Sequence, residues 1–214
     1  MNYVLILFSI FILFALIIPI YLKLKEQKKK TLSILVKASG TSLGILFAIA
    51  GIVKHSDKLS ILIFIGIIFG LLGDVLLELY LPLGGFAFFL GNILYISSMI
   101  SIERPRTIHY FIFFLFIVFF ALSFGKDFQS FGKYRYLLLP YALIVAFMAS
   151  MSIPFILLQG IDGMYLGFGT FLFAVSDYLL AYRILYSTKK EFHKISLGVY
   201  YLSQLLIGIS IFMK

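Results

Sequence analysis

The chain has 214 residues, of which 62% are hydrophobic and 13% are charged, and its mean hydropathy is +1.09. A soluble domain of this length is far less apolar, so the composition indicates an integral membrane protein. The connecting segments are too short to fold separately, which predicts a single membrane domain over residues 1–214 and excludes a soluble catalytic module. The formal net charge of +9 comes from basic clusters at the ends of apolar runs, where lipid headgroups and topology account for it, so we expect no nucleic acid partner.

Apolar runs long enough to cross a bilayer follow one another along the chain, separated by charged segments or by Gly and Pro. The first run has no basic residue before it, so we interpret it as a retained helix and not as a signal peptide. Pro140 and Pro154 predict kinks in the sixth run. The predicted fold class is all-α, a polytopic membrane helix bundle of about eight transmembrane helices. The spans are 3–22, 32–53, 59–79, 84–101, 108–125, 135–157, 163–185 and 195–213.

Lys and Arg residues are divided unequally between the two ends of these helices. Twelve follow the first, third, fifth and seventh spans, whereas five lie on the other side. The positive-inside rule therefore places the first group in the cytoplasm and both termini outside, most simply in a bacterial inner (plasma) membrane. The twelve are Lys23, Lys25, Lys28, Lys29, Lys30, Lys126, Lys133, Arg135, Arg183, Lys189, Lys190 and Lys194.

Two aspartates interrupt membrane-length apolar runs. Asp74 lies in Gly-Leu-Leu-Gly-Asp-Val-Leu-Leu (70–77) and Asp177 in Leu-Phe-Ala-Val-Ser-Asp-Tyr-Leu-Leu-Ala (172–181). An ionised Asp near the bilayer centre costs about 2.5–3.5 kcal/mol on insertion scales, so it normally faces a partner or a wet cavity. One offset aligns the two segments, which is consistent with two parallel four-helix halves. Because both helices run in the same direction, we predict that the two aspartates share one site in the cytoplasmic half.

Polar side chains of other helices fall at the same depth as the aspartates. Glu78 lies one turn beyond Asp74 and either extends the site or reaches the solvated headgroup region; we favour the second interpretation. For the remaining residues the alternative is interhelical hydrogen bonding that serves assembly alone. We predict that Asp74 and Asp177 are catalytic. The predicted substrate-binding residues are Lys37, Asn92, Tyr95, Tyr141, Tyr200, Tyr201, Gln204 and Glu78.

No metal and no cofactor are expected at this site. The chain has no cysteine, and therefore no disulfide and no thiolate ligand. The three histidines, His55, His109 and His193, all fall in predicted loops, which argues against an intramembrane zinc site rich in His. The remaining carboxylates, amides and phenols suit hard cations poorly at this number of ligands.

The two aspartate segments, together with Lys37, residues 91–95 and Tyr-Tyr-Leu-Ser-Gln-Leu-Leu-Ile (200–207), resemble the YhhN-like lysoplasmalogenase family over nearly the whole chain. The resemblance implies hydrolysis of the vinyl ether bond of a lysoplasmalogen, a lysophospholipid, to a fatty aldehyde and a glycerophospho-headgroup. Besides this substrate, membrane lipids are the only partners that the resemblance implies. It does not determine the headgroup of the substrate or the oligomeric state of the protein. The family often has Lys-Pro where this chain has Lys37-Ala38, and His where it has Asn92, which cannot transfer a proton.

The residues present suit this chemistry. Vinyl ether hydrolysis begins with proton transfer to carbon and passes through an oxocarbenium ion, so one carboxyl acts as general acid while the other stabilises the cation or activates water. Lys37 either favours ionisation of one carboxyl or binds the lipid phosphate.

Two alternatives remain at this stage. A proton- or cation-coupled transporter also suits paired acids in parallel halves, and a polar lining that reaches the outer face would favour it. An intramembrane aspartyl protease is a weaker alternative, because the chain lacks a Pro-Ala-Leu segment.

Overall fold

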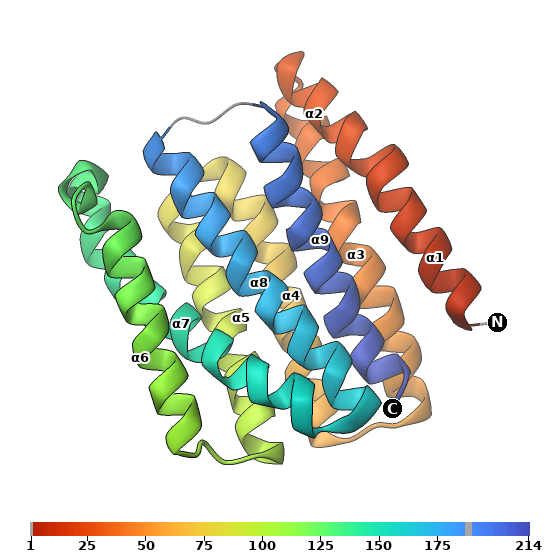
Figure 1. Cartoon of the computed structure of the whole chain (residues 1–214). Coiled ribbons are helices and arrows are strands. Elements are labelled where there is room, and N and C mark those ends of the chain that lie inside the picture. The colour runs from red at the N-terminus through yellow and green to blue at the C-terminus, as the bar shows by residue number, and fades with distance from the viewer. Residues whose placement is uncertain (1, 187–189) are drawn as a thin grey trace.

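The computed structural model describes residues 2–186 and 190–214, and this part of the chain is helical almost throughout, without strands (Figure 1). Eight helical segments are long and apolar enough to cross a membrane, so the predicted all-α, eight-span membrane fold is confirmed. The elements are α1 (Asn2–Ile12), η1 (Leu13–Ile17), α2 (Ile18–Glu26), α3 (Lys30–Lys54), α4 (Lys58–Leu79), α5 (Leu81–Ile102), α6 (Thr107–Phe124), η2 (Phe128–Tyr134), α7 (Arg135–Leu158), α8 (Gly160–Tyr186) and α9 (Lys190–Phe212).

The observed helices extend beyond most of the predicted spans. The last helix, expected over 195–213, begins at Lys190, because its polar first turn is helical although it is not apolar. Hydropathy marks only the part of a helix that lies in hydrocarbon, whereas backbone hydrogen bonds continue into the headgroup region. Pro140 and Pro154 both lie inside α7, which remains one helix. The connection between the fifth and sixth predicted spans contains the 3₁₀ segment η2, in which Gly132 has a φ of 57°.

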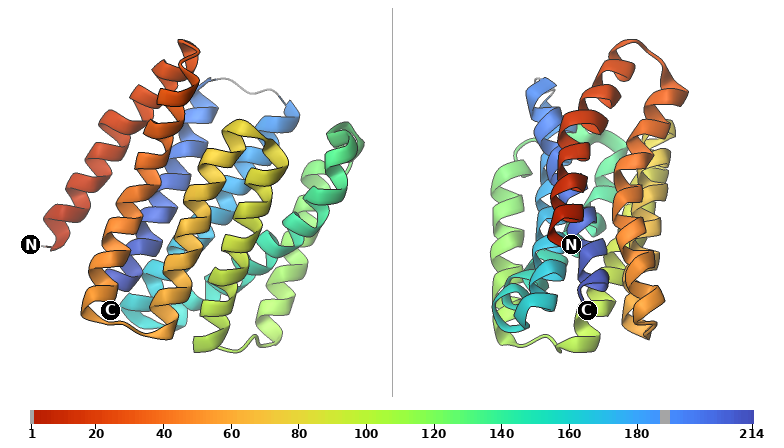
Figure 2. Two further views of the ribbon diagram at one scale, coloured as in Figure 1. Left: turned by 180° about the vertical axis from the view of Figure 1, so that it is seen from behind. Right: turned by 90° about the vertical axis from the view of Figure 1, so that its right-hand side faces the viewer.

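Consecutive spans alternate in direction, so α4, α6 and α8 all end at one end of the bundle, which we call the site end (Figures 1 and 2). Six helices, α3, α4, α5, α7, α8 and α9, pack together, and α9 lies against α8, α3 and α4. The first span, formed by α1, η1 and α2, lies outside α3, and α6 lies outside α7 at the opposite edge. The helix ends and loops at the site end carry the larger group of cations, of which Lys189 lies outside the described residues.

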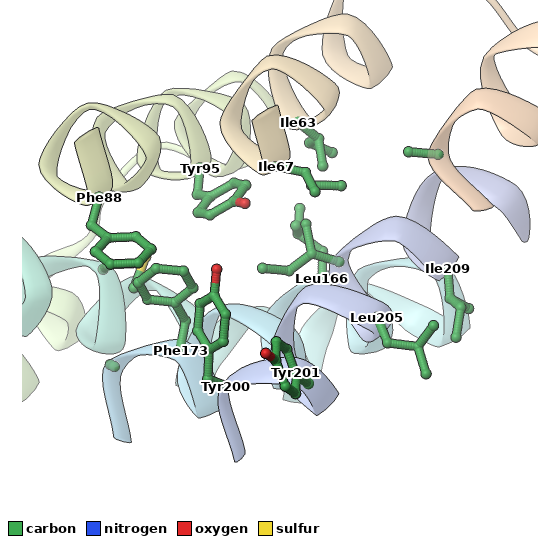
Figure 3. Packing of buried hydrophobic residues seen from close by; sticks show 14 of the residues in the cluster. Ile63, Ile67, Phe88, Tyr95, Leu166, Phe173, Tyr200, Tyr201, Leu205 and Ile209 are labelled. Atoms are coloured by element: carbon green, nitrogen blue, oxygen red, sulfur yellow. The ribbon is translucent and has the colours of Figure 1, made fainter. Parts of the chain in front are cut away.

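An aromatic cluster fills the core between α5, α8 and α9. The rings of Phe88, Tyr95, Phe173 and Tyr200 meet edge to face with centroids 5.7–6.0 Å apart (Figure 3). Such pairs contribute about 0.5–1.5 kcal/mol beyond the area they bury. The packing fixes the directions in which the two phenol groups point, and these hydroxyls enter the polar network described below.

The backbones of α3 and α9 approach closely at two glycines. A Cβ added at Gly44 would lie 2.5 Å from the carbonyl oxygen of Gln204, and a Cβ added at Gly208 would meet the carbonyl of Gly44. Small residues at such positions allow membrane helices to reach full van der Waals contact. This contact matters because α3 carries Lys37 and α9 carries Tyr200.

We expect Gly44→Ala to lower the free energy of unfolding by about 1–3 kcal/mol, since the new methyl group overpacks the interface. The matched control is Gly85→Ala on α5, where an added Cβ meets no atom within 4 Å. Both substitutions change the intrinsic helix propensity alike, so the difference between them reports the helix contact. Unfolding by sodium dodecyl sulfate in mixed micelles, followed by circular dichroism, measures it. Equal stability of the two variants would contradict the expectation.

Candidate functional site

Asp74 is held by side chains from two neighbouring helices. Its side chain is 2% exposed, and its Oδ2 accepts hydrogen bonds from the hydroxyls of Thr41 on α3 and Tyr200 on α9, the latter at 2.9 Å. The ammonium of Lys37 lies 3.7 Å from Oδ1. Both oxygens of this buried carboxylate therefore have partners, as buried charges require.

Glu78 belongs to the same network, and the preference for a solvated Glu78 was wrong. Its Oε1 accepts a hydrogen bond of 2.7 Å from the hydroxyl of Tyr21, and the ammonium groups of Lys25 and Lys37 lie 3.1 and 3.3 Å away. Glu78 is drawn into the network by tertiary packing: the first span lies beside α3 and places the side chains of Tyr21 and Lys25 over the end of α4. Ion pairs thus run from the partly exposed Lys25 through Glu78 and Lys37 to Asp74.

Asp177 on α8 has a different set of neighbours. Its Oδ2 accepts a hydrogen bond of 2.7 Å from Tyr141 on α7. Asn92 on α5 is fully buried next to both groups, yet neither atom of its amide completes a hydrogen bond with any described residue. Each aspartate therefore accepts a hydroxyl hydrogen bond from the helix that precedes its own, Thr41 in one case and Tyr141 in the other.

Two cavities meet at Asp177. The polar cavity, of about 40 Å³, contains both aspartates, although no hydrogen bond joins the two carboxyls, each of which has its own donors. The apolar cavity, of about 260 Å³, lies between α5, α6, η2, α7 and α8. The two cavities share Leu77, Phe88, Asp177 and Leu180. The polar cavity is lined by Lys37, Asp74, Leu77, Phe88, Ser176, Asp177, Leu180, Arg183, His193, Ser196, Leu197 and Tyr200.

The apolar cavity has a lining of aromatic and aliphatic side chains at the site end. Apart from Asp177, Ser130 and the hydroxyls of three tyrosines, its walls carry no polar side chain. Its residues include Phe88, Phe120, Phe124, Phe131, Leu137 and Tyr141. Pockets of this kind bind the apolar part of a ligand, and the few polar groups at the wall orient it.

Five predicted site residues line neither cavity: Glu78, Asn92, Tyr95, Tyr201 and Gln204. Tyr95 donates a hydrogen bond of 3.3 Å to Oε1 of Gln204, and Tyr201 donates one of 2.9 Å to the carbonyl of Lys37. These contacts join α5 to α9 and α9 to α3. Tyr201 follows Tyr200 by about 100° around the helix, so only one of two adjacent tyrosines can point toward the carboxylates. These residues share one depth in the membrane, but depth does not determine the direction in which a side chain points around its helix.

The prediction that all three histidines lie in loops is wrong for two of them. His109 lies in the first turn of α6, where its Nδ1 accepts a hydrogen bond of 2.9 Å from the backbone of Arg106. His193 lies in α9, lines the polar cavity and meets the ring of Tyr21 edge to face at 5.9 Å. For His193 the error comes from a helix that continues past its apolar run, whereas His109 already falls at the start of the predicted span 108–125. A search of the described residues finds no group of three His, Cys, Asp or Glu placed to hold a metal ion.

Besides Tyr21 and Lys25 of the first span, three residues around the aspartates were missed at the level of sequence: Thr41, Arg183 and His193. Thr41 follows Lys37 by one helical turn, and His193 precedes Tyr200 by two turns, so helical spacing from known site residues would have found both. Arg183 was counted only as a topological charge, and no spacing signal in the sequence distinguishes it. Its place in the polar cavity depends on the packing of α8 against α9.

The fold and the site define a polytopic membrane protein in which buried, hydrogen-bonded carboxylates line a cavity at one end of the bundle. The chain belongs to the YhhN family, whose model matches residues 32–211. No curated protein and no solved structure matches the chain. The matched segment contains Lys37, Asp74 and Asp177, whereas Tyr21 and Lys25 lie in the first span, which precedes it.

Proposed function

We propose that this protein is a membrane-embedded hydrolase that cleaves the vinyl ether bond of a lysoplasmalogen, a 1-alkenyl-glycerophosphocholine or 1-alkenyl-glycerophosphoethanolamine. The products are a fatty aldehyde and the glycerophospho-headgroup. Membership in the YhhN family fits this activity. The observation that carries the proposal is the position of Asp177, whose carboxyl lies where an apolar cavity meets a polar cavity that contains a second carboxylate.

The two aspartates take different roles in the proposed reaction. Asp74 lies beside the Lys37 ammonium, whereas Asp177 has a phenol as its partner and no ion pair within the described ranges. We therefore assign the negative charge to Asp74 and the transferable proton to Asp177. Asp177 gives its proton to the enol-ether carbon, and the resulting oxocarbenium ion is stabilised by Asp74. Water adds to the cation and returns a proton to the carboxylates, and the hemiacetal collapses to aldehyde and alcohol.

The substrate is expected to lie across the junction of the two cavities. Its alkenyl chain occupies the apolar cavity, since transfer of each methylene from water contributes about 0.8 kcal/mol. Its polar end occupies the polar cavity, so that the vinyl ether lies at Asp177.

The opposite end of the bundle supports hydrolysis in preference to coupled transport. A cavity of about 80 Å³ near Lys214 shares no lining residue with the two cavities at the site end. Ile63 and Leu166, which line this cavity, and the neighbouring Ile67 are buried apolar side chains (Figure 3). A transporter requires a polar route to both faces, whereas a hydrolase requires access only from its substrate's side.

The proposed orientation follows from charge. The site end carries the larger group of Lys and Arg residues, so we place it in the cytoplasm and both termini outside, in a bacterial inner membrane. The substrate would then enter from the inner leaflet, where membrane lipids surround the site end.

Release of fatty aldehyde from lysoplasmalogen by the purified protein tests the proposed function. The saturated 1-alkyl analogue is the control substrate, because it has the same chain and headgroup but no enol ether to protonate. We expect aldehyde from the first lipid and none from the second. Absence of aldehyde from the vinyl ether, with protein that is folded by circular dichroism, would overturn the proposal.

We expect Gly85→Leu to lower kcat/KM for a long-chain lysoplasmalogen at least about tenfold, because four added carbons occupy the space of the chain. Gly85 lines the apolar cavity, and a Cβ there meets no atom within 4 Å, so the new side chain starts in open space on the cavity wall. The control is Ala121→Leu on α6, an exposed position outside both cavities. Equal kcat/KM for the two variants would show that the chain does not occupy this cavity.

A further inference from the structure

Arg183 is a cation of the polar cavity that no described residue pairs with directly, although Glu78 and Tyr21 act on it electrostatically at longer range. It lies in the last turn of α8, and it forms no hydrogen bond or ion pair with any residue in the ranges 2–186 and 190–214. The other cation of the cavity, the Lys37 ammonium, lies within 4 Å of both Asp74 and Glu78. A half-buried guanidinium without an anion is costly to maintain, which points to a ligand that supplies the missing charge.

The carboxylates near Arg183 are already engaged by other donors. Asp74 accepts from Thr41 and Tyr200, and Glu78 accepts from Tyr21 and two lysines. Asp177, on the helix of Arg183 itself, accepts from Tyr141. No carboxylate of the site therefore forms a direct ion pair with Arg183, and Glu78 acts on it only at longer range.

We propose that Arg183, together with His193, binds the phosphate of the lysophospholipid headgroup, an inference that rests on the proposed function. A guanidinium presents five N–H donors in a planar fork that matches a phosphate in two places. His193 lines the same cavity from α9, and its ring orientation is set by the edge-to-face contact with Tyr21. The two residues thus approach the cavity from adjacent helices.

The spacing along α8 fits a single lipid. Asp177 and Arg183 are six residues apart, which corresponds to about 9 Å along the helix axis. Side chains on a helix lean toward its N-terminus, so the long arginine side chain reaches back toward Asp177 and shortens this gap. In a lysoplasmalogen only the three carbons of glycerol separate the ether oxygen from the phosphate ester oxygen. Phosphate at Arg183 would hold the vinyl ether at Asp177.

The assignment predicts that the protein discriminates against an alkenyl ether that lacks phosphate. Wild-type kcat/KM for lysoplasmalogen is expected to exceed that for 1-alkenylglycerol roughly 10- to 100-fold, the range that charged hydrogen bonds provide. Arg183→Gln is expected to raise KM for lysoplasmalogen by a similar factor, to change kcat less than about threefold, and to leave 1-alkenylglycerol hydrolysis unchanged. Arg135→Gln is the control, since Arg135 lies at the same end, donates to Tyr136 and lines neither cavity.

A binding measurement separates this inference from the proposed reaction. Purified protein is titrated with a 1-alkyl lysophospholipid, with the matching 1-alkylglycerol and with inorganic phosphate. Loss of affinity in Arg183→Gln for the phospholipid alone supports the phosphate site even if no vinyl ether is cleaved. If Arg183→Gln lowers the affinity for the phospholipid and the alkylglycerol equally, or for neither, the phosphate assignment is overturned. If inorganic phosphate binds the wild-type protein as tightly as the phospholipid does, the site binds free phosphate and not a lipid headgroup. Should Arg183→Gln fail to fold, Arg183→Lys, which keeps the charge but loses the fork, is expected to show the same selective loss to a smaller extent.

Discussion

Asp74→Asn and Asp177→Asn are each expected to lower the turnover of lysoplasmalogen at least about 100-fold while the protein remains folded. Positioned general acids and bases contribute about 10²- to 10⁴-fold in rate. The amide keeps the size of the carboxyl but can neither transfer its proton nor carry its charge. The Thr41, Tyr200 and Tyr141 hydroxyls that now donate to these residues can still donate to an amide oxygen. Aldehyde release and circular dichroism on the same preparations measure activity and fold.

The control for this pair is Asp57→Asn. Asp57 lies at the opposite end of the bundle, where it caps α4 and pairs with Lys214, so its loss should leave turnover unchanged. Because the two aspartates act as one unit, the double variant is expected to be no slower than the slower single variant. If either single variant retains more than about a tenth of the wild-type rate, less than about 1.4 kcal/mol of the barrier depends on that carboxyl and the paired mechanism is wrong.

Lys37→Met is expected to lower the free energy of unfolding by about 3–5 kcal/mol, because removing one member of a buried ionic network leaves the others uncompensated. The Lys37 side chain is 6% exposed, and it lies 3.7 Å from Asp74 and 3.3 Å from Glu78. Methionine keeps the apolar stem, so the change isolates the charge. Unfolding in mixed micelles measures the loss.

Lys25→Met provides a matched comparison, since Lys25 also pairs with Glu78 but its side chain is 42% exposed. Pairs of this exposure contribute about 0–1 kcal/mol. In the combination Lys37→Met with Asp74→Asn, part of the stability should return, because one of the two stranded charges is removed. If Lys37→Met lowers the free energy of unfolding no more than Lys25→Met does, burial does not increase the contribution of these ion pairs to stability.

Much of the fold was predictable from the sequence for a simple physical reason. A helix that crosses hydrocarbon needs about 20 mostly apolar residues, so each span can be recognised from its own composition without knowledge of its neighbours. The same constraint made Asp74 and Asp177 stand out, since a charge within such a run is costly. Their common depth followed from the alternating direction of the spans, and in the structure both line one cavity.

The details of the site were decided by packing. Sequence does not determine how far a helix is rotated about its axis, and this rotation sends Tyr200 to Asp74 but Tyr201 to the carbonyl of Lys37. Nor does it show which helix covers the end of another, so the contact of Tyr21 with Glu78 was not foreseen. Polar helix ends leave no hydropathy signal, which is why His193 was misplaced.

The sequence by itself determined that this protein is an eight-helix membrane bundle with two buried aspartates at a common depth, because the bilayer imposes length and apolarity on every span separately. Only the tertiary structure decided that the site has a polar and an apolar cavity meeting at Asp177, with Arg183 left unpaired in the polar one among the described residues. An apolar helix surface is as well accommodated by lipid as by another helix, so the hydrophobic effect does not decide which helices associate. Close packing and hydrogen bonds between residues distant in sequence decide which helices become neighbours. A close contact such as that of Gly44 with α9 forms only where the surfaces of the two helices are complementary, so it cannot be predicted from either helix alone.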